Sequence, residues 1–334
     1  MSQRPKDAGS RFEKAVFLGK LLFFREIGVI TALALIFIFF SMLAPPFASL
    51  KNVFNILRQA SEIGIIAVSA CVLITSGEFD LSVGSVYGLS GVLMALMIKE
   101  MGIDAWIALL VGLLVATGVG LYNGLVTTKV HIPSFITTLG SMMIFRGLTL
   151  VISHGWPIAG LPESSLYGVF GRVRLGMLPV PVLWLALFSL ICWYLLHQTA
   201  FGIKVLAVGG NPEAARYSGI PNDKIKTICF TMTSLSAGLA SVVSLSFLQS
   251  VTPTQGSGLE LEVIAASVIG GTSLRGGSGS VLGAVLGALI MAVIRNGLVM
   301  VGTGAYWQDA LIGMILVLAV TLNAQLERRR STRV

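Results

Sequence analysis

The chain has 334 residues, of which 55% are hydrophobic and only 11% are charged, and its formal net charge is +8. Its mean hydropathy of +0.88 excludes an ordinary water-soluble domain and indicates an integral membrane protein. Lys and Arg cluster beside and between apolar runs, where they determine topology, so the positive charge does not indicate nucleic-acid binding. Cys71, Cys192 and Cys229 lie far apart and suggest neither a disulfide framework nor a metal or redox site.

The apolar runs identify the candidate membrane spans, because a helix needs about 20 apolar residues to cross about 30 Å of hydrocarbon. Some candidate runs are short or interrupted by glycine. The expected spans are residues 28–50, 63–77, 81–98, 105–128, 132–153, 180–196, 227–251, 263–274, 281–294 and 307–325. The sequence therefore predicts an all-α membrane protein, a polytopic bundle of about ten transmembrane helices.

The orientation follows from the basic residues, because Lys and Arg resist translocation. With ten spans and the N-terminus inside, sixteen of the 23 Lys and Arg fall on the cytoplasmic side and five on the other, with Arg146 and Arg295 within spans. We therefore expect a cytoplasmic N-terminal segment (1–27), a transmembrane domain (28–326) and a basic cytoplasmic tail (327–334).

Two carboxylates interrupt the apolar sequence between the second and third predicted spans. Glu78 and Asp80 could act directly in transport, since an unpaired carboxylate at membrane depth is costly. The favoured interpretation is that both lie at the cytoplasmic end, with Asp80 capping the next helix. The surrounding "GSVYGLSG" resembles "GSVLGAVLG" from Gly279, either as an internal repeat or as glycine spacing typical of packed helices.

Isolated polar residues within the spans are candidates for the translocation path. For each neutral one, a helix-to-helix hydrogen bond is the favoured interpretation over a substrate contact. Arg146 is expected to reach an interface or pair with a carboxylate. The stretch 153–181 is either a surface connector or a docking platform for an external partner. The neutral candidates are Asn123, Thr137, Thr138, Asn296 and Gln308.

The stretch "GGNPEAARYSGI" (209–220) lies in the longest cytoplasmic loop, 197–226. Asn211 suits a helix N-cap, Pro212 the first turn, Glu213 the positive helix start and Gly219 the end. The sequence predicts a helix of about two turns, too short to persist alone in water. It either packs on its own protein or offers a small Ala-lined face to a cytosolic partner.

Four long motifs carry a resemblance to a known family. "ITSGEFDLSVGSV", "IPSFITTLGSMMIFRGLTLV", "TAFGIKVLAVGGNPEAARYSGI" and "LELEVIAASVIGGTSLRGGSGSVLGAVLGALI" resemble, in order and spacing, the permease subunits of bacterial ribose-type monosaccharide ABC importers. The resemblance extends from about residue 28 to 323. Family members commonly read Gly-Gly-Ile-Asp-Leu-Ser where this chain has Gly77-Glu78-Phe79-Asp80-Leu81-Ser82, so the packing at that bend and the substrate do not carry over.

The resemblance implies a multi-pass permease in the bacterial inner membrane with both termini cytoplasmic. Its partners would be a cytosolic ATP-binding subunit, a periplasmic sugar-binding protein and a second permease copy or similar subunit. ATP and Mg would be bound by the partner ATPase and no cofactor by this chain, which also lacks a Walker A pattern and is not expected to be an enzyme. Residues matching the family's ATPase-coupling helix are Gly209, Gly210, Asn211, Glu213, Ala214, Ala215, Arg216, Ser218 and Gly219.

Two other functions remain open from the residues themselves. An ion- or proton-coupled secondary carrier would use Glu78 or Asp80 and would work without a partner. A channel or membrane scaffold would be indifferent to ATP.

Overall fold

The computed structural model describes residues 27–304, 307, 310–314, 317–318 and 321. The predicted segments 1–26 and 327–334, and Gln308, lie outside the described residues. The helices are Ile27–Leu43, α2 (Leu50–Thr75), α3 (Val83–Lys99), α4 (Ala105–Lys129), α5 (Ser134–Ile152), α6 (Ser165–Tyr167), α7 (Val180–Gln198), α8 (Ala200–Gly210), α9 (Pro212–Tyr217), α10 (Asn222–Leu248), α11 (Leu259–Ile269) and α12 (Val281–Met300). The short elements are η1 (Pro45–Ala48), the π-helical turn η2 (Gly168–Arg172), and the antiparallel strand pairs β1 (Ile158–Ala159) with β4 (Ser250–Val251) and β2 (Arg174–Leu175) with β3 (Leu178–Pro179).

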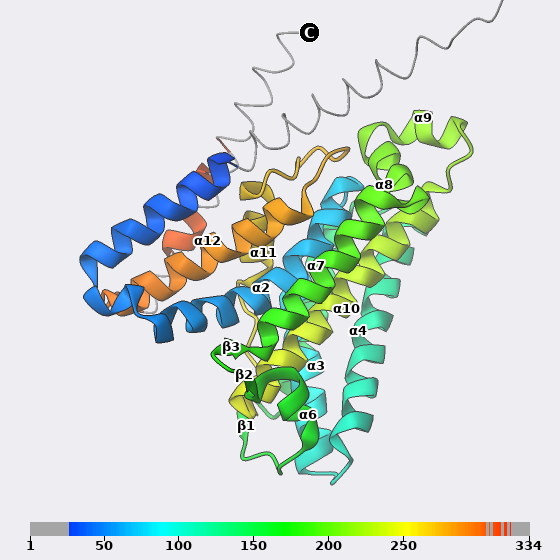
Figure 1. The fold of residues 1–334 in the computed structure, drawn as a ribbon. Coiled ribbons are helices and arrows are strands. Elements are labelled where there is room, and N and C mark those ends of the chain that lie inside the picture. Colours follow the sequence, from blue (N-terminus) through cyan, green and yellow to red (C-terminus); the bar gives the residue numbers. More distant parts are fainter. Residues whose placement is uncertain (1–26, 305–306, 308–309, 315–316, 319–320, 322–334) are drawn as a thin grey trace, which may run out of the picture.

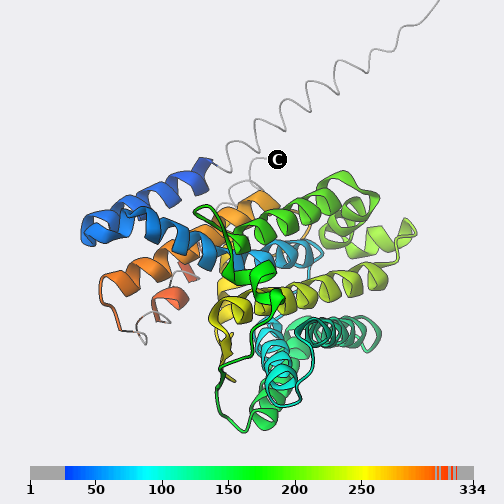
Figure 2. The ribbon, with the colours of Figure 1, turned by 60° about the horizontal axis from the view of Figure 1, so that its bottom comes forward.

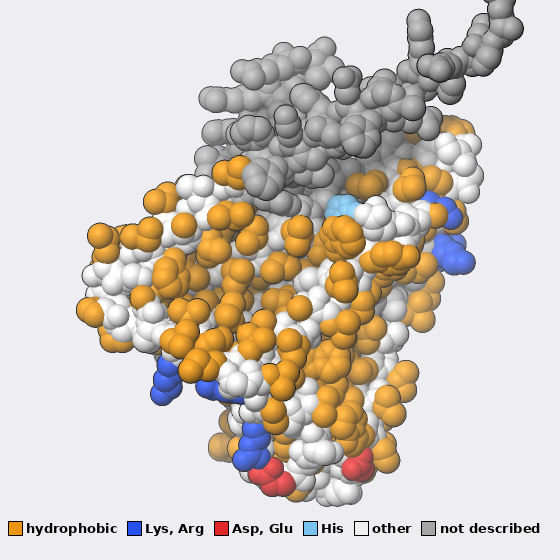
Figure 3. Space-filling model, viewed as in Figure 1, with side chains coloured by type: hydrophobic (Ala, Val, Ile, Leu, Met, Phe, Trp, Pro, Cys, Tyr) orange, Lys and Arg blue, Asp and Glu red, His pale blue; other side chains and the backbone are white. Residues whose placement is uncertain are grey.

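The described chain confirms the all-α membrane class. Six helices are long and apolar enough to cross a membrane, namely α2, α4, α5, α7, α10 and α12. The Ile27–Leu43 helix and α3 are shorter apolar helices. Apolar side chains cover the flank of the bundle in Figure 3, as expected of a surface that faces lipid.

Helices α2 and α10 form the centre of the bundle (Figures 1 and 2), where they pack against each other. Helices α3 and α4 pack on α10, while α11 and α12 pack on α2. The approach of α4 to α10 is close because Gly120 and Gly124 face it. A Cβ on either glycine would lie 2.7 Å from the nearest atom of α10, contributed by Phe230 and Thr227 respectively.

The first predicted span, 28–50, is wrong at its end. The helix stops at Leu43, because Pro45 and Pro46 disfavour its continuation, and a 3-10 turn follows. Helix α2 begins at Leu50 after the N-cap Ser49, so the predicted span 63–77 is only its second part.

The connection predicted to contain Lys51 and Arg58 is therefore largely helix. Helix α2 accommodates the charge of Arg58 because its guanidinium pairs with Glu62 one turn later, at 2.6 Å. The predicted loop 197–226 also contains more helix than expected, since α8 occupies part of it and α10 starts at Asn222 rather than 227. Helix α11 is displaced toward the N-terminus of its predicted span, 263–274.

The two similar glycine motifs both provide surfaces for close backbone contact. On α3, a Cβ at Gly84 would overlap the carbonyl oxygen of Gly256, and one at Gly88 would lie 2.8 Å from that of Gln255. On α12, Gly283 meets Gly270 in the same way. Close packing of helices therefore accounts for the glycines in both motifs.

Contacts across the chain define two ends of the bundle. At the α9 end, the backbone N–H of Gly277 donates to the carbonyl of Thr75 at 2.9 Å. At the opposite end, which we call the β end, Ile158 pairs with Val251. The breaks after α2 and α11 thus lie with α8 and α9 at one end, while residues 153–179 lie at the other (Figure 1).

Candidate coupling and translocation sites

The predicted short helix is confirmed as α9, Pro212–Tyr217. The Asn211 side chain caps it by accepting a hydrogen bond from the backbone N–H of Ala214 at 3.0 Å. Gly219 follows the helix with φ of 78°, a left-handed conformation that glycine adopts without strain. The Asn222 side chain then donates to the carbonyl of Pro212 at 2.7 Å, which fixes the turn to the start of α10.

The faces of α9 differ from the uniform Ala-lined surface expected from the sequence. Ala215 is buried in a cluster with Val208 and Ile225, because its side chain points toward the bundle. The exposed face instead consists of Glu213, Ala214, Arg216, Tyr217, Ser218 and the neighbouring Asn211, Gly210 and Gly219. Tyr217 is 91% exposed and was missing from the predicted coupling residues; an aromatic residue beside the polar cassette was the available signal.

Gly209 is also a packing residue rather than part of the exposed surface. A Cβ at this position would overlap the carbonyl oxygen of Thr75 and lie 2.7 Å from the backbone nitrogen of Gly277. The end of α8 therefore touches both membrane breaks.

The carboxylates of the first break both have partners. Glu78 pairs with Lys226 of α10 at 2.5 Å. Asp80 accepts hydrogen bonds from the backbone N–H and hydroxyl of Ser82, at 2.8 and 2.6 Å, just before α3, as the capping interpretation expects. Burial raises the pKa of Asp80, opposed by the hydrogen bonds from Ser82.

Two of the neutral polar candidates connect helices as predicted. Asn123 of α4 donates to the Ser82 hydroxyl at 2.8 Å and accepts from Ser141 of α5 at 2.5 Å. Asn296 of α12 accepts from the side chain of Asn52 on α2 at 2.8 Å.

The helix-to-helix prediction is wrong for the two threonines. The hydroxyl of Thr138 donates to the carbonyl of Ser134 within its own helix at 2.8 Å, which satisfies it locally. The buried Thr137 hydroxyl has no hydrogen-bond partner among the described residues. Neither lines the large polar cavity described below.

Arg146 of α5 binds the irregular segment Thr252–Gly258. Its guanidinium donates to the carbonyls of Pro253 and Gln255, at 3.1 and 2.8 Å, instead of forming the expected ion pair with a carboxylate among the described residues. The segment Thr252–Gly258 therefore connects three parts of the molecule: α5 through Arg146, α3 through its glycines, and β1 through β4.

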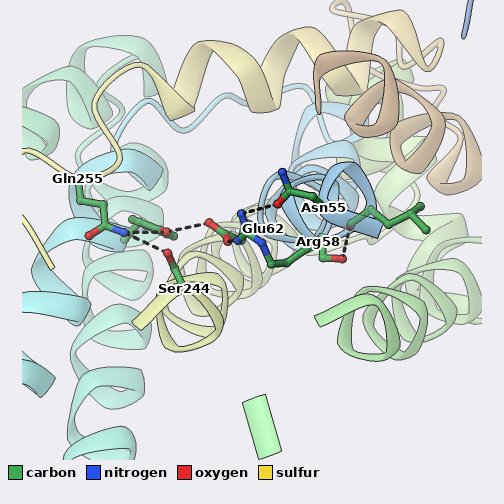
Figure 4. Close-up of polar contacts among 8 residues, drawn as sticks. Asn55, Arg58, Glu62, Ser244 and Gln255 are labelled. Atoms are coloured by element: carbon green, nitrogen blue, oxygen red, sulfur yellow. Dashed lines mark hydrogen bonds and ion pairs between the residues drawn. The ribbon is translucent and has the colours of Figure 1, made fainter. Parts of the chain in front are cut away.

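This segment borders a polar cavity of about 290 Å³. Figure 4 shows its row of contacts, in which Gln255 donates to Ser244 at 3.1 Å and Arg58 pairs with Glu62. Tyr87 connects Glu62 with Gln255, since its hydroxyl donates to Glu62 and accepts from Gln255, both at 3.3 Å. The sequence prediction missed these residues, apart from noting Arg295 within a span; the charged pair at positions 58 and 62 in an apolar region was the available signal.

Comparisons with known proteins agree with this architecture. The profile of the family described as "Branched-chain amino acid transport system / permease component" matches residues 52–320. The chain is 39% identical to the Ribose import permease protein RbsC of Bacillus subtilis (strain 168), over 90% of this chain and 92% of the relative. It is 34% identical to the Xylose transport system permease protein XylH of Escherichia coli (strain K12), over 90% of this chain and 92% of that protein.

A third relative, the Autoinducer 2 import system permease protein LsrC of Photorhabdus laumondii, is 33% identical over 90% of each chain. No solved structure matches the chain. The chain belongs to this permease family and is a membrane permease subunit of an ABC importer.

Proposed function

We propose that this permease translocates a monosaccharide, delivered by a periplasmic binding protein, and that α9 couples it to a separate cytosolic ATPase. The α9 end faces the cytoplasm, as do both termini, and a second permease copy or similar subunit completes the transmembrane unit. The sugar class is supported by the substrates of the ribose and xylose permeases, to which the chain is 39% and 34% identical. ATP and Mg belong to the ATPase, and this chain is not an enzyme.

One observation supports the coupling role of α9. The helix has an exposed face, and the end of α8 that precedes it packs against the breaks after α2 and α11. Arg216 and Tyr217 project from α9, while Gly209 contacts Thr75 and Gly277 at its base. ATP-driven closure of the cytosolic subunits would move α9, and the backbone contacts would carry that movement to the breaks. The permease pair would then open toward the docked binding protein, and hydrolysis would reset it.

The partnered state of both carboxylates argues against proton coupling as the driving force. Glu78 is held by Lys226 at 2.5 Å and Asp80 by the cap of α3. A carrier that exchanges protons with solvent needs a carboxylate that can change partners during transport. The Glu78 and Asp80 carboxylates both have a structural role in this chain.

The test is copurification of the cytosolic ATPase with tagged permease. Arg216→Glu and Tyr217→Ala change exposed side chains and should leave insertion and thermal stability unchanged. We expect each to reduce ATPase retention, and the pair to lose at least about 90% of it, since aromatic and Arg side chains dominate interfaces.

The control is Trp156→Ala, an exposed aromatic residue in the connection at the β end, opposite to α9. It should retain the ATPase as the unmodified chain does. Equal retention by Arg216→Glu/Tyr217→Ala would remove α9 as the main contact. Failure of the unmodified chain to retain any ATPase, together with gradient-driven uptake by the purified chain, would favour the carrier.

A further inference from the structure

The polar cavity beside Glu62 is built from residues far apart in the sequence. Its lining comes from α2, α3, α10, α11 and α12 and from the segment Thr252–Gly258. The volume of about 290 Å³ is near the lower end of the range for small-molecule sites, about 300–1,000 Å³. Nine of its thirteen lining residues carry a charged, hydroxyl or amide side chain, and apolar groups line the rest. The cavity is thus suited to a small solute that has both polar and apolar surface.

The charges around the cavity cancel in pairs. Arg58 and Glu62 form one ion pair at 2.6 Å, and Arg295 forms the other with Glu262. A solute with a net charge would find no uncompensated counter-charge among these residues. A zwitterion would have to compete with both existing pairs, because its ammonium and carboxylate groups need the same partners.

The cavity nevertheless retains hydrogen-bonding capacity. The Tyr87 and Ser244 hydroxyls can each donate or accept, and the Gln255 amide offers both functions. This mixture matches sugar hydroxyls, which also donate and accept.

The cavity is open toward the β end. Leu248 and Ser257 on its rim are exposed, and Ser257 belongs to the segment that continues from β4. Strand β4 pairs with β1, at the start of the long connection 153–179. A solute released at the β end can therefore enter the cavity beside Thr252–Gly258, the segment that follows β4.

We propose that this cavity holds one uncharged pentose or hexose during translocation, with the Glu62–Tyr87–Gln255 row contacting its hydroxyls. This inference rests on the proposed import of a monosaccharide, and it assigns that solute to a site inside a single permease chain. The two ion pairs remain intact, so selection is for hydroxyls rather than charge.

The test uses Ser257→Cys on the cavity rim, in the complete transporter in right-side-out membrane vesicles. The rate of reaction with an impermeant methanethiosulfonate is measured alone and with D-ribose, D-xylose, D-glucose, D-galactose, L-leucine or gluconate. Natural Cys71, Cys192 and Cys229 are buried. Arg174→Cys, exposed on β2 and outside the cavity, is the matched reporter control.

We expect at least one of the four neutral sugars to slow labelling of Ser257→Cys by about threefold or more at saturation, and leucine and gluconate to have no effect. Tyr87→Phe removes one hydroxyl without changing ring size and should weaken the protection about tenfold in sugar concentration. Tyr194→Phe on the outer surface of α7 should not change it.

Absence of labelling, absence of protection by every sugar, equal protection of Arg174→Cys, or protection that is unchanged by Tyr87→Phe would each overturn the assignment. Protection by leucine instead of a sugar would identify an amino-acid site and also overturn it. ATPase retention through α9 is measured separately, so loss of this cavity assignment leaves the coupling proposal intact, and the reverse holds as well.

Discussion

Glu78 and Lys226 join the break between α2 and α3 to the first turns of α10, with 2.5 Å between carboxylate and ammonium. Glu78 adds a second carboxylate to a break that already contains Asp80, and Lys226 supplies the opposite charge that this carboxylate needs. Both side chains are mostly buried, with 13% and 19% of their surface exposed. The pair therefore bridges two elements next to α9.

Lys226→Met should destabilise the protein by about 1–3 kcal/mol, because it leaves the Glu78 carboxylate largely buried without its partner. Glu78→Gln in the same chain should recover most of this loss. Thermal unfolding in detergent of the two single variants and the double variant measures the coupling between them. Additive effects would mean that the pair contributes nothing as a pair.

Gly209→Ala should prevent α8 from packing against the two membrane breaks. The new Cβ would overlap the Thr75 carbonyl, and both neighbours are backbone atoms that cannot move aside independently. Overpacking of this kind costs about 1–3 kcal/mol or more. Purified yield and melting temperature should both fall.

The matched control is Gly210→Ala, where the nearest atom to a new Cβ is the Cα of Gly277 at 3.9 Å. This variant should behave as the unmodified protein. If both variants unfold at the same temperature as the unmodified protein, the close contact at Gly209 does not constrain the molecule.

The presence of the helices could be predicted from the sequence, because it depends on local hydropathy. The cap at Asn211 could also be predicted, because its hydrogen bond joins residues only three positions apart. The start of α2 could not be predicted, since the charge of Arg58 is accommodated through its pair with Glu62 and its contact with the ring of Phe247 on α10. The polar cavity was missed for another reason: Tyr87 and Gln255 are separated by 168 residues, and only the packing of α3 against Thr252–Gly258 brings them together.

Asp80→Asn should retain ATP-driven uptake to within about twofold, because the amide keeps an oxygen that can accept from Ser82. Asp80→Ala removes the acceptor and should cost about 1–3 kcal/mol in stability. Loss of uptake in Asp80→Asn with a stable, assembled transporter would indicate a direct role for the charge, as a proton-coupled carrier requires.

Arg146→Met should loosen Thr252–Gly258, because two carbonyls lose their donor from a single guanidinium. Hydrogen bonds to a charged group contribute about 1.5–3 kcal/mol, so amide exchange in this segment should accelerate about tenfold or more. Hydrogen–deuterium exchange with mass spectrometry measures the segment directly. Arg172→Met is the control, since its exposed pair with Glu163 at the same end should contribute little. Unchanged exchange in Arg146→Met would mean that the glycine contacts of α3 and the β1–β4 pairing suffice to hold the cavity rim in place.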